Sequence, residues 1–194
     1  MQLSERAKEL IPKSRIVSTN RWNDYSDEII AIFQAADDQG RYLTDEDLEQ
    51  LKKLAPERSS SLEKAKLLRD QAPEIIAKAR EQVLETFPKI TEPGGDLYPP
   101  ARAEACWRDY WHFLRCITYG IAANQIQYTS EEGLNNMQLL YQELRVPLKA
   151  MVLGLEKLKF FGLQSFSEEE QAKLSPYFDH LISAMKQFST VEMR

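Results

Sequence analysis

The stretch Ala103–Tyr119, which reads AEACWRDYWHFLRCITY, combines strong helix formers with several aromatic side chains. It contains neither proline nor glycine, so a single helix is predicted here. Residues three or four positions apart share one face of a helix. A thiol, a carboxylate and an apolar stripe therefore share one face, at Cys106, Asp109, Tyr110, Phe113 and Ile117. By itself, a cysteine in such a pattern is usually a buried structural residue, and a nearby acid is usually a surface residue.

Four other segments with patterns of their own surround this helix in the sequence. They are ADDQGRYLTDEDL at Ala36–Leu48, PGGDLY at Pro93–Tyr98, YQELRVPLKAMV at Tyr141–Val152 and SPYFDHLISAM at Ser175–Met185. Together with CWRD, LR and TYG of the central stretch, they resemble motifs of the phycobiliproteins, the antenna proteins of cyanobacteria and red algae. The order and spacing are similar from about Asp27 to Phe188. The chain looks most like an allophycocyanin-type subunit, as a divergent alpha-like or minor core paralogue.

Helix-start and helix-stop signals predict about eight helices and no convincing strand. Side chains that cap helix N-termini occur at Ser26 and Thr44, where two helices are expected to begin. Two separate helices are expected at Ser59–Arg69 and Pro73–Thr86, because proline suits the first turn of a helix. Further helices are expected after Ser130, Pro147 and Ser167.

The resemblance implies an all-α, globin-like fold in which residues 25–194 form one domain. Residues 25–55 would form a helical hairpin that projects from the globin-like core and packs against a partner subunit. Residues 1–24 form an N-terminal extension outside the resemblance. We interpret this extension as a loosely held arm whose basic residues and Trp22 dock a neighbouring protein. The alternative is a frayed terminus without a role.

Composition limits the function classes that remain open. The 194 residues carry a formal charge of −5 and a pI near 5.3, which argues against general nucleic-acid binding. No apolar run approaches the ~20 residues of a membrane span, and no secretory signal is recognised, so a cytoplasmic location is expected. Cys106 and Cys116 lie ten residues apart on one helix, roughly 15 Å by helical rise, which excludes a disulfide. No metal-ligand motif is present, so no metal is expected.

The resemblance implies that Cys106 carries one covalent linear tetrapyrrole, a phycocyanobilin-type bilin, through a thioether. Asp109 would then accept hydrogen bonds from the inner pyrrole N–H groups and favour the protonated pigment, and Arg108 would bind a propionate. Asp96, where many family members have asparagine, is also expected at the pigment. The expected aromatic neighbours of the pigment are Tyr98, Tyr110 and Tyr119. Attachment would need a separate lyase or slow spontaneous addition, and would be helped if the thiol were partly ionised.

By position in the motifs, Asp37 and Arg115 match residues that form reciprocal ion pairs across the family's alpha–beta interface. The implied partner is another phycobiliprotein subunit, in an alpha–beta pair or a homodimer, with assembly into rings. The implied function is light harvesting and transfer of excitation energy, with no chemical turnover. The implied location is the cytoplasmic face of the thylakoid membrane, which the chain would reach only through the assembly.

Several residues depart from the family pattern and keep an alternative open. Arg145 stands where the motif has glycine, and Trp107, Trp111 and His112 make the central helix bulkier. The alternative is a bilin-free or weakly bilin-binding scaffold, assembly factor or regulator that docks on antenna proteins. An enzyme that pairs Cys106 with His112 is disfavoured, because six residues along a helix point the two side chains apart.

Overall fold

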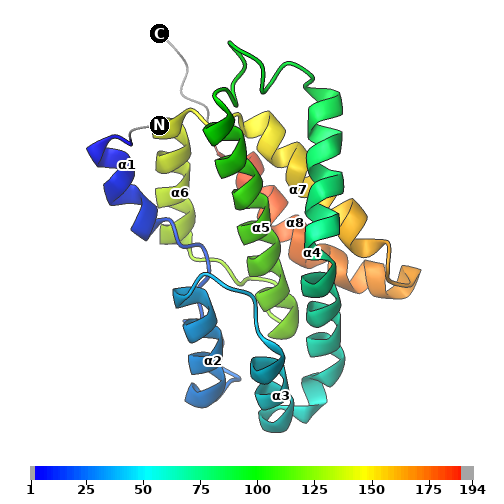
Figure 1. Cartoon of the computed structure of the whole chain (residues 1–194). Coiled ribbons are helices and arrows are strands. Elements are labelled where there is room, and N and C mark those ends of the chain that lie inside the picture. Colours follow the sequence, from blue (N-terminus) through cyan, green and yellow to red (C-terminus); the bar gives the residue numbers. More distant parts are fainter. Residues whose placement is uncertain (1–2, 189–194) are drawn as a thin grey trace.

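The computed structural model describes residues 3–188, and within this range the chain forms eight α-helices and two short 3-10 helices (Figure 1). The prediction of an all-α chain is confirmed. The one β-contact in this range is an isolated antiparallel bridge between Val17 and Thr129. The helices are α1 (Glu5–Leu10), α2 (Asp27–Asp38), α3 (Asp45–Leu54), α4 (Ser59–Thr86), α5 (Pro100–Ala122), α6 (Glu131–Leu144), α7 (Leu148–Leu163) and α8 (Glu168–Lys186). Among them, none combines the length and the apolarity that crossing a bilayer requires.

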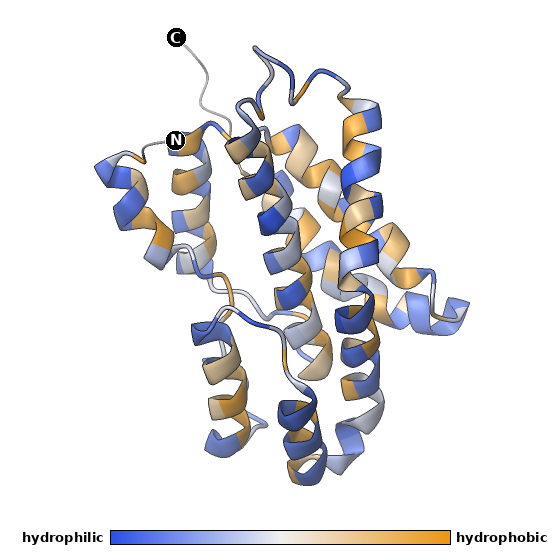
Figure 2. Cartoon of the chain, in the orientation of Figure 1, coloured by the Kyte–Doolittle hydropathy of each residue, from blue (hydrophilic) through white to orange (hydrophobic). Residues whose placement is uncertain are grey.

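The core is built around α5, which packs against α4, α7 and α8 (Figure 1). In Figure 2 hydrophobic and hydrophilic residues divide between the two sides of most helices, as helices around a shared core require. The predicted central helix is confirmed, and it runs from Pro100 to Ala122. Six of its side chains are 0–1% exposed, namely Tyr110, Leu114, Ile117, Tyr119, Ile121 and Ala122.

The side chain of Tyr110 on α5 packs directly against α7 at Gly154. A Cβ atom at this position would lie 2.1 Å from Cζ of Tyr110, so only glycine allows the tyrosine ring to lie on the backbone of α7. The Tyr110 hydroxyl also donates a hydrogen bond of 3.0 Å to the carbonyl oxygen of Ala150. The ring and its hydroxyl together fix how α7 lies along α5.

The prediction of two separate helices at Ser59–Arg69 and Pro73–Thr86 is wrong, because both segments belong to the single helix α4. This helix has 28 residues, with Pro73 inside it. An interior proline costs a helix about 3 kcal/mol, because one backbone hydrogen bond is lost and the ring crowds the preceding turn. Apolar residues on both sides of Pro73 are buried against α5 and α7, which offsets this cost; they include Leu62, Leu68, Ile75 and Val83.

The N-terminal extension is packed on the rest of the chain, so the prediction of a loosely held arm is wrong for its described part, residues 3–24. Helix α1 lies against α6, and Ser18 N–H donates to the Tyr128 carbonyl at 2.9 Å. Trp22 is 1% exposed and packs edge-on against Phe33, with ring centroids 4.9 Å apart. Trp22 therefore belongs to the core of its own chain and is not free to anchor a partner.

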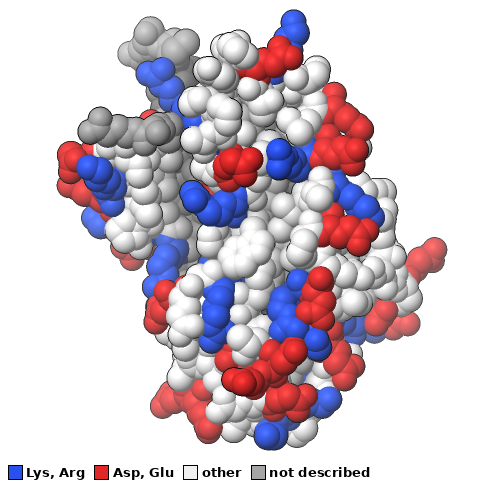
Figure 3. Space-filling model, viewed as in Figure 1, with Lys and Arg blue, Asp and Glu red and all other residues white. Residues whose placement is uncertain are grey.

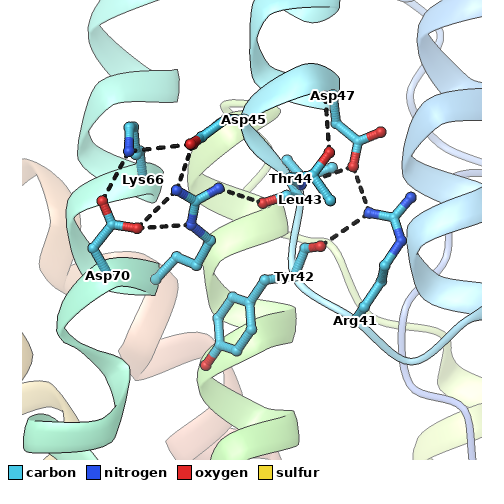
Figure 4. Close-up of polar contacts among 9 residues, drawn as sticks. Arg41, Tyr42, Leu43, Thr44, Asp45, Asp47, Lys66 and Asp70 are labelled. Atoms are coloured by element: carbon cyan, nitrogen blue, oxygen red, sulfur yellow. Dashed lines mark hydrogen bonds and ion pairs between the residues drawn. The ribbon is translucent and has the colours of Figure 1, made fainter.

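Helices α2 and α3 lie at the lower end of Figure 1, where α3 packs against α4. The predicted capping box of α3 is present, because Thr44 and Asp47 bond each other's backbone N–H groups. Arg69 of α4 donates to the Leu43 carbonyl at 2.8 Å and to Asp45 at 2.6 Å (Figure 4). Acidic and basic side chains interleave on this part of the surface in Figure 3. These contacts fix the start of α3 on α4.

Replacing Gly154 with alanine is expected to destabilise the protein by about 1–3 kcal/mol, because the added methyl group would overlap the Tyr110 ring. Gly162→Ala in the same helix is the control. Its Cβ would lie 3.3 Å from its nearest neighbours, the side chains of Leu68 and Phe178, and alanine has the higher helix propensity. Urea unfolding of both variants measures the difference, and equal stability of the two would contradict a tight α5–α7 contact at Gly154.

Candidate functional site

A groove of about 840 Å³ opens between the loop that follows α4, the end of α6 and the start of α7. Its walls are largely apolar, with Phe87, Val146, Leu148 and Phe188 among them. The lining also includes three cationic residues and one acid, namely Lys89, Arg145, Lys149 and Asp96. Its volume falls in the range of about 300–1,000 Å³ that is usual for small-molecule sites. The groove is therefore the candidate site for an extended, mainly apolar molecule.

The loop on one side of the groove is held by glycines and by its own backbone. Gly94 has φ +90°, a conformation that favours glycine. A Cβ at Gly95 would lie 2.2 Å from the Lys89 carbonyl oxygen, so the chain can fold back here only without a side chain. Leu97, which is 2% exposed, closes the loop by donating its N–H to the Ile90 carbonyl at 2.8 Å. The sequence PGGD thus forms a fixed wall.

Cys106 lies behind this groove and does not line it. The cysteine is 5% exposed, and its sulfur is 2.9 Å from Sδ of Met151. Met151 directly follows Ala150, which is part of the groove wall. Burial raises the pKa of the Cys106 thiol to about 12, and the nearby Asp109 adds to this shift. Partial ionisation of the thiol, which would help attachment, is therefore disfavoured in the pigment-free protein.

Asp109 is linked to the groove through Tyr141. The Tyr141 hydroxyl lies 2.7 Å from Oδ2 of Asp109 and donates a hydrogen bond to it, and Tyr141 lines the groove. Burial raises the pKa of Asp109 to about 6, although the Tyr141 bond and the charge of Arg108 act in the opposite direction. The predicted shared face of α5 is present, since Cys106, Asp109 and Tyr110 all contact α6 or α7.

The other residues expected at a pigment differ in their placement. Asp96 is exposed and lines the groove, whereas Arg108 is exposed and Tyr98 is 45% exposed, and neither lines it. Tyr110 is fully buried behind Ala150. Tyr119 lies thirteen residues from Cys106 on the same helix, about 20 Å away by helical rise, so it cannot share a small site with the cysteine.

Tyr119 belongs instead to a buried ionic cluster near α2. Arg115 donates to Oδ1 of Asp37 at 2.8 Å and to the Tyr119 hydroxyl at 3.0 Å, and Arg15 of the N-terminal extension lies 2.5 Å from Oδ2 of Asp37. Asp37 and Arg115 are only 8% and 7% exposed. In the single chain these two residues therefore pair with each other. A role across a subunit interface would require this internal pair to be exchanged for an intermolecular one.

Cys106 and His112 are not brought together. His112 lies beside the turn after α2, because a Cβ at Gly40 would be 3.8 Å from its ring. Burial and two nearby arginines lower the pKa of His112 to about 4. No group of three or more potential metal ligands occurs among residues 3–188.

Three contributors to the site were missed by sequence reasoning. Met151 covers the thiol, and Tyr141 bonds Asp109, but each lies more than thirty residues from its partner in sequence. Arg102 bonds the carbonyl oxygens of Asp96, Leu144 and Arg145, at 3.1, 2.9 and 3.0 Å, and so ties the loop to the end of α6. Nothing in its spacing distinguishes Arg102 from an ordinary arginine in a first helical turn.

Comparison with known proteins adds independent information. Residues 31–185 match the family model described as phycobilisome protein. The chain is 32% identical over 150 residues to an allophycocyanin alpha-B chain of Porphyra purpurea, which covers 77% of this chain and 93% of the relative. It is 31% identical over 151 residues to an allophycocyanin alpha chain of Galdieria sulphuraria, and this alignment covers 78% of this chain and 94% of the relative. An allophycocyanin alpha chain of Mastigocladus laminosus is 30% identical over 150 residues, an alignment that covers 77% of this chain and 94% of the relative.

The family match spans most of the chain, and the relatives align over nearly their whole length. The chain therefore belongs to the phycobilisome protein family, whose members are globin-like, all-helical antenna proteins without enzymatic activity.

Proposed function

We propose that this chain is a light-harvesting subunit of the phycobilisome that holds one phycocyanobilin-type linear tetrapyrrole in the groove, attached to Cys106 by a thioether. Membership of the family supports the general role of a bilin-binding antenna subunit. The observation that carries the finer proposal is the groove itself. Its wall includes Tyr141, which bonds Asp109, and Ala150, which precedes the Met151 that covers Cys106.

The residues around the groove fit a pigment with inner N–H groups and a cationic protonated form. A bound bilin would supply the absorption of light. The Asp109 carboxylate would accept hydrogen bonds from the inner N–H groups of the pigment, and the positive charge of the protonated pigment would lower the raised pKa of Asp109. The family resemblance would give a propionate to Arg108, which is exposed but does not line the groove. Asp96 and Tyr98 would lie near the mouth, and Tyr110 would support the wall from behind.

Attachment would proceed by addition of the Cys106 sulfur to a carbon–carbon double bond on the pigment's first ring. One S–C bond would form and the thiol proton would pass to the adjacent carbon, so that no group would leave. Because the thiol pKa is about 12, very little thiolate exists at neutral pH. Met151 must also move aside, because its sulfur contacts that of Cys106. We therefore propose that attachment needs either a separate lyase or a slow opening of this contact.

Assembly with other phycobiliprotein subunits follows from the family, and we propose an alpha–beta type pair or a homodimer, with rings as the next level. The α2–α3 hairpin, within residues 25–55, is the proposed subunit contact. Excitation energy would pass between pigments of adjacent subunits. We place the assembly on the cytoplasmic face of the thylakoid membrane, where phycobilisomes lie.

One observation favours a second candidate function. Cys106 is sealed behind Met151 and does not line the groove. A chain with this arrangement could keep the fold but carry no pigment, and act as a scaffold, assembly factor or regulator that docks on antenna proteins. Whether the cysteine becomes modified distinguishes the two functions.

In a host that produces bilins, the purified chain is expected to carry covalent pigment, seen as zinc-enhanced fluorescence of the denatured protein on a gel. Cys106→Ala should abolish the band. Cys116→Ala is the matched control and should keep it, because Cys116 is 2% exposed within the core and lies roughly 15 Å along the helix. Absence of the band in the chain without substitutions would favour the scaffold function.

Met151→Ala is expected to raise the rate at which a small maleimide modifies Cys106 in the pigment-free native protein, by about tenfold or more, because the side chain that covers the sulfur is removed. Met185→Ala makes an equal truncation in the core of α8 and controls for general loosening. Mass spectrometry assigns the modified cysteine. If Met185→Ala accelerated the reaction equally, Met151 would not be the specific cover.

Asp109→Asn is expected to stabilise the pigment-free protein at pH 7.5. The Asp109 pKa is about 6 in the folded protein and 3.8 for the unperturbed group, so ionisation costs stability as the pH rises from 3.8 through 6. The cost is at most about 3 kcal/mol above pH 6 and absent below pH 3.8. Urea unfolding at pH 4.5 and 7.5 should therefore show a larger benefit at the higher pH.

Asp70→Asn provides the control of opposite sign, because Lys66 and Arg69 lower the pKa of Asp70 and its ionised form is favoured in the folded protein. That variant should gain no stability at pH 7.5. A benefit of Asp109→Asn that did not change with pH would show that Asp109 is not held in a costly ionised form.

A further inference from the structure

Arg145 has a backbone conformation that is unfavourable for its residue type. It ends α6 with φ 53° and ψ 50°, the left-handed region in which glycine and asparagine are the usual residues. A left-handed non-glycine residue is uncommon, and such strain is concentrated at functional sites. The conformation is fixed by the chain around it, since Arg102 bonds the carbonyl oxygens of Leu144 and Arg145. The strained residue thus holds a long cationic side chain at the groove.

Lys149 is a second locally unfavourable choice in the same place. It lies in the first turn of α7, where the partial positive charge of the helix end disfavours cations, and that turn contains no acidic residue. Both Arg145 and Lys149 line the groove, and both are exposed. Two choices that each oppose local preference therefore converge on one groove, which indicates a functional requirement.

The charges at the groove are not balanced within the chain. Lys89 of the facing loop also lines it, and Asp96 is the one acid in the lining. No ion pair within residues 3–188 involves Lys89, Arg145 or Lys149, whereas seventeen ion pairs occur elsewhere in that range. The groove therefore combines apolar walls with cations that are free to bind an anion. The matching ligand is an extended apolar molecule that carries carboxylates.

We propose that Arg145 and Lys149 bind the two propionate carboxylates of the tetrapyrrole, so that the groove prefers the free diacid to its ester. This inference rests on the proposed function. Arg145 can grip one carboxylate through two parallel N–H donors, and Lys149 supplies a point charge for the other. Arg108, to which the family resemblance gives a propionate, does not line the groove. The position of Arg145 in this chain, where the motif has glycine, makes the contact a property of this chain.

The test compares phycocyanobilin, which has two free propionates, with its dimethyl ester, which has none. Both are titrated by absorbance into the full chain carrying Cys106→Ala, so that binding stays reversible. In the chain that carries only Cys106→Ala, the free acid should bind at least about tenfold more tightly than the ester, as expected for charge-assisted hydrogen bonds. Added salt should weaken binding of the acid more than binding of the ester.

Arg145→Gly and Lys149→Ala should each weaken binding of the free acid about tenfold and leave binding of the ester unchanged. Lys13→Ala is the control, since it removes an exposed cation that does not line the groove and takes part in no ion pair within residues 3–188, and it should change neither affinity by more than about twofold. Arg145→Gly should also raise the urea midpoint of the pigment-free protein, because glycine relieves the left-handed strain. A gain in stability together with a loss of affinity separates a binding role from a structural one.

Two outcomes would overturn the inference, and they differ in what else they remove. If acid and ester bind equally, or if Arg108→Ala alone weakens the acid, the proposed carboxylate contacts are wrong but the pigment site stands. If neither pigment binds to the chain with or without Cys106, the proposed function fails together with this inference.

Discussion

The contact between Tyr110 and α7 is the constraint on which the site depends. Its ring lies where a Cβ of Gly154 would be, and its hydroxyl bonds Ala150, so α7 can lie along α5 in one register only. That register places Met151 on the sulfur of Cys106 and turns Ala150 toward the groove. A small shift of α7 would therefore change both access to the thiol and the shape of the groove.

The two ends of α5 serve different purposes. Near its start, Cys106 and Asp109 lie behind a groove with apolar walls and free cations. Near its end, Arg115 is held in a buried pair with Asp37, which the N-terminal extension closes through Arg15. A buried ion pair is costly to break by removing one partner, because the other charge is left unpaired. Any subunit that uses these residues must replace the internal pair with an equivalent one.

Local signals predicted the helices well, because caps such as Thr44 act within a few residues of sequence. The local signals failed where contacts between residues far apart in the sequence determine the structure. Pro73 does not end a helix here, because burial on both sides of it outweighs the local cost, and Trp22 is covered by a helix that follows it in the chain. The cover over the thiol by Met151 joins residues 45 apart, so no spacing rule could reveal it. The distance of Tyr119 from the cysteine was, by contrast, accessible from helical rise alone.

The most direct test of the account is a crystal structure of the chain purified from a host that produces bilins. The account predicts continuous density from the sulfur of Cys106 into the groove beside Tyr141, with Met151 displaced from its present contact. An empty groove with the sulfur–sulfur contact of 2.9 Å intact, or pigment bound at another surface, would contradict it.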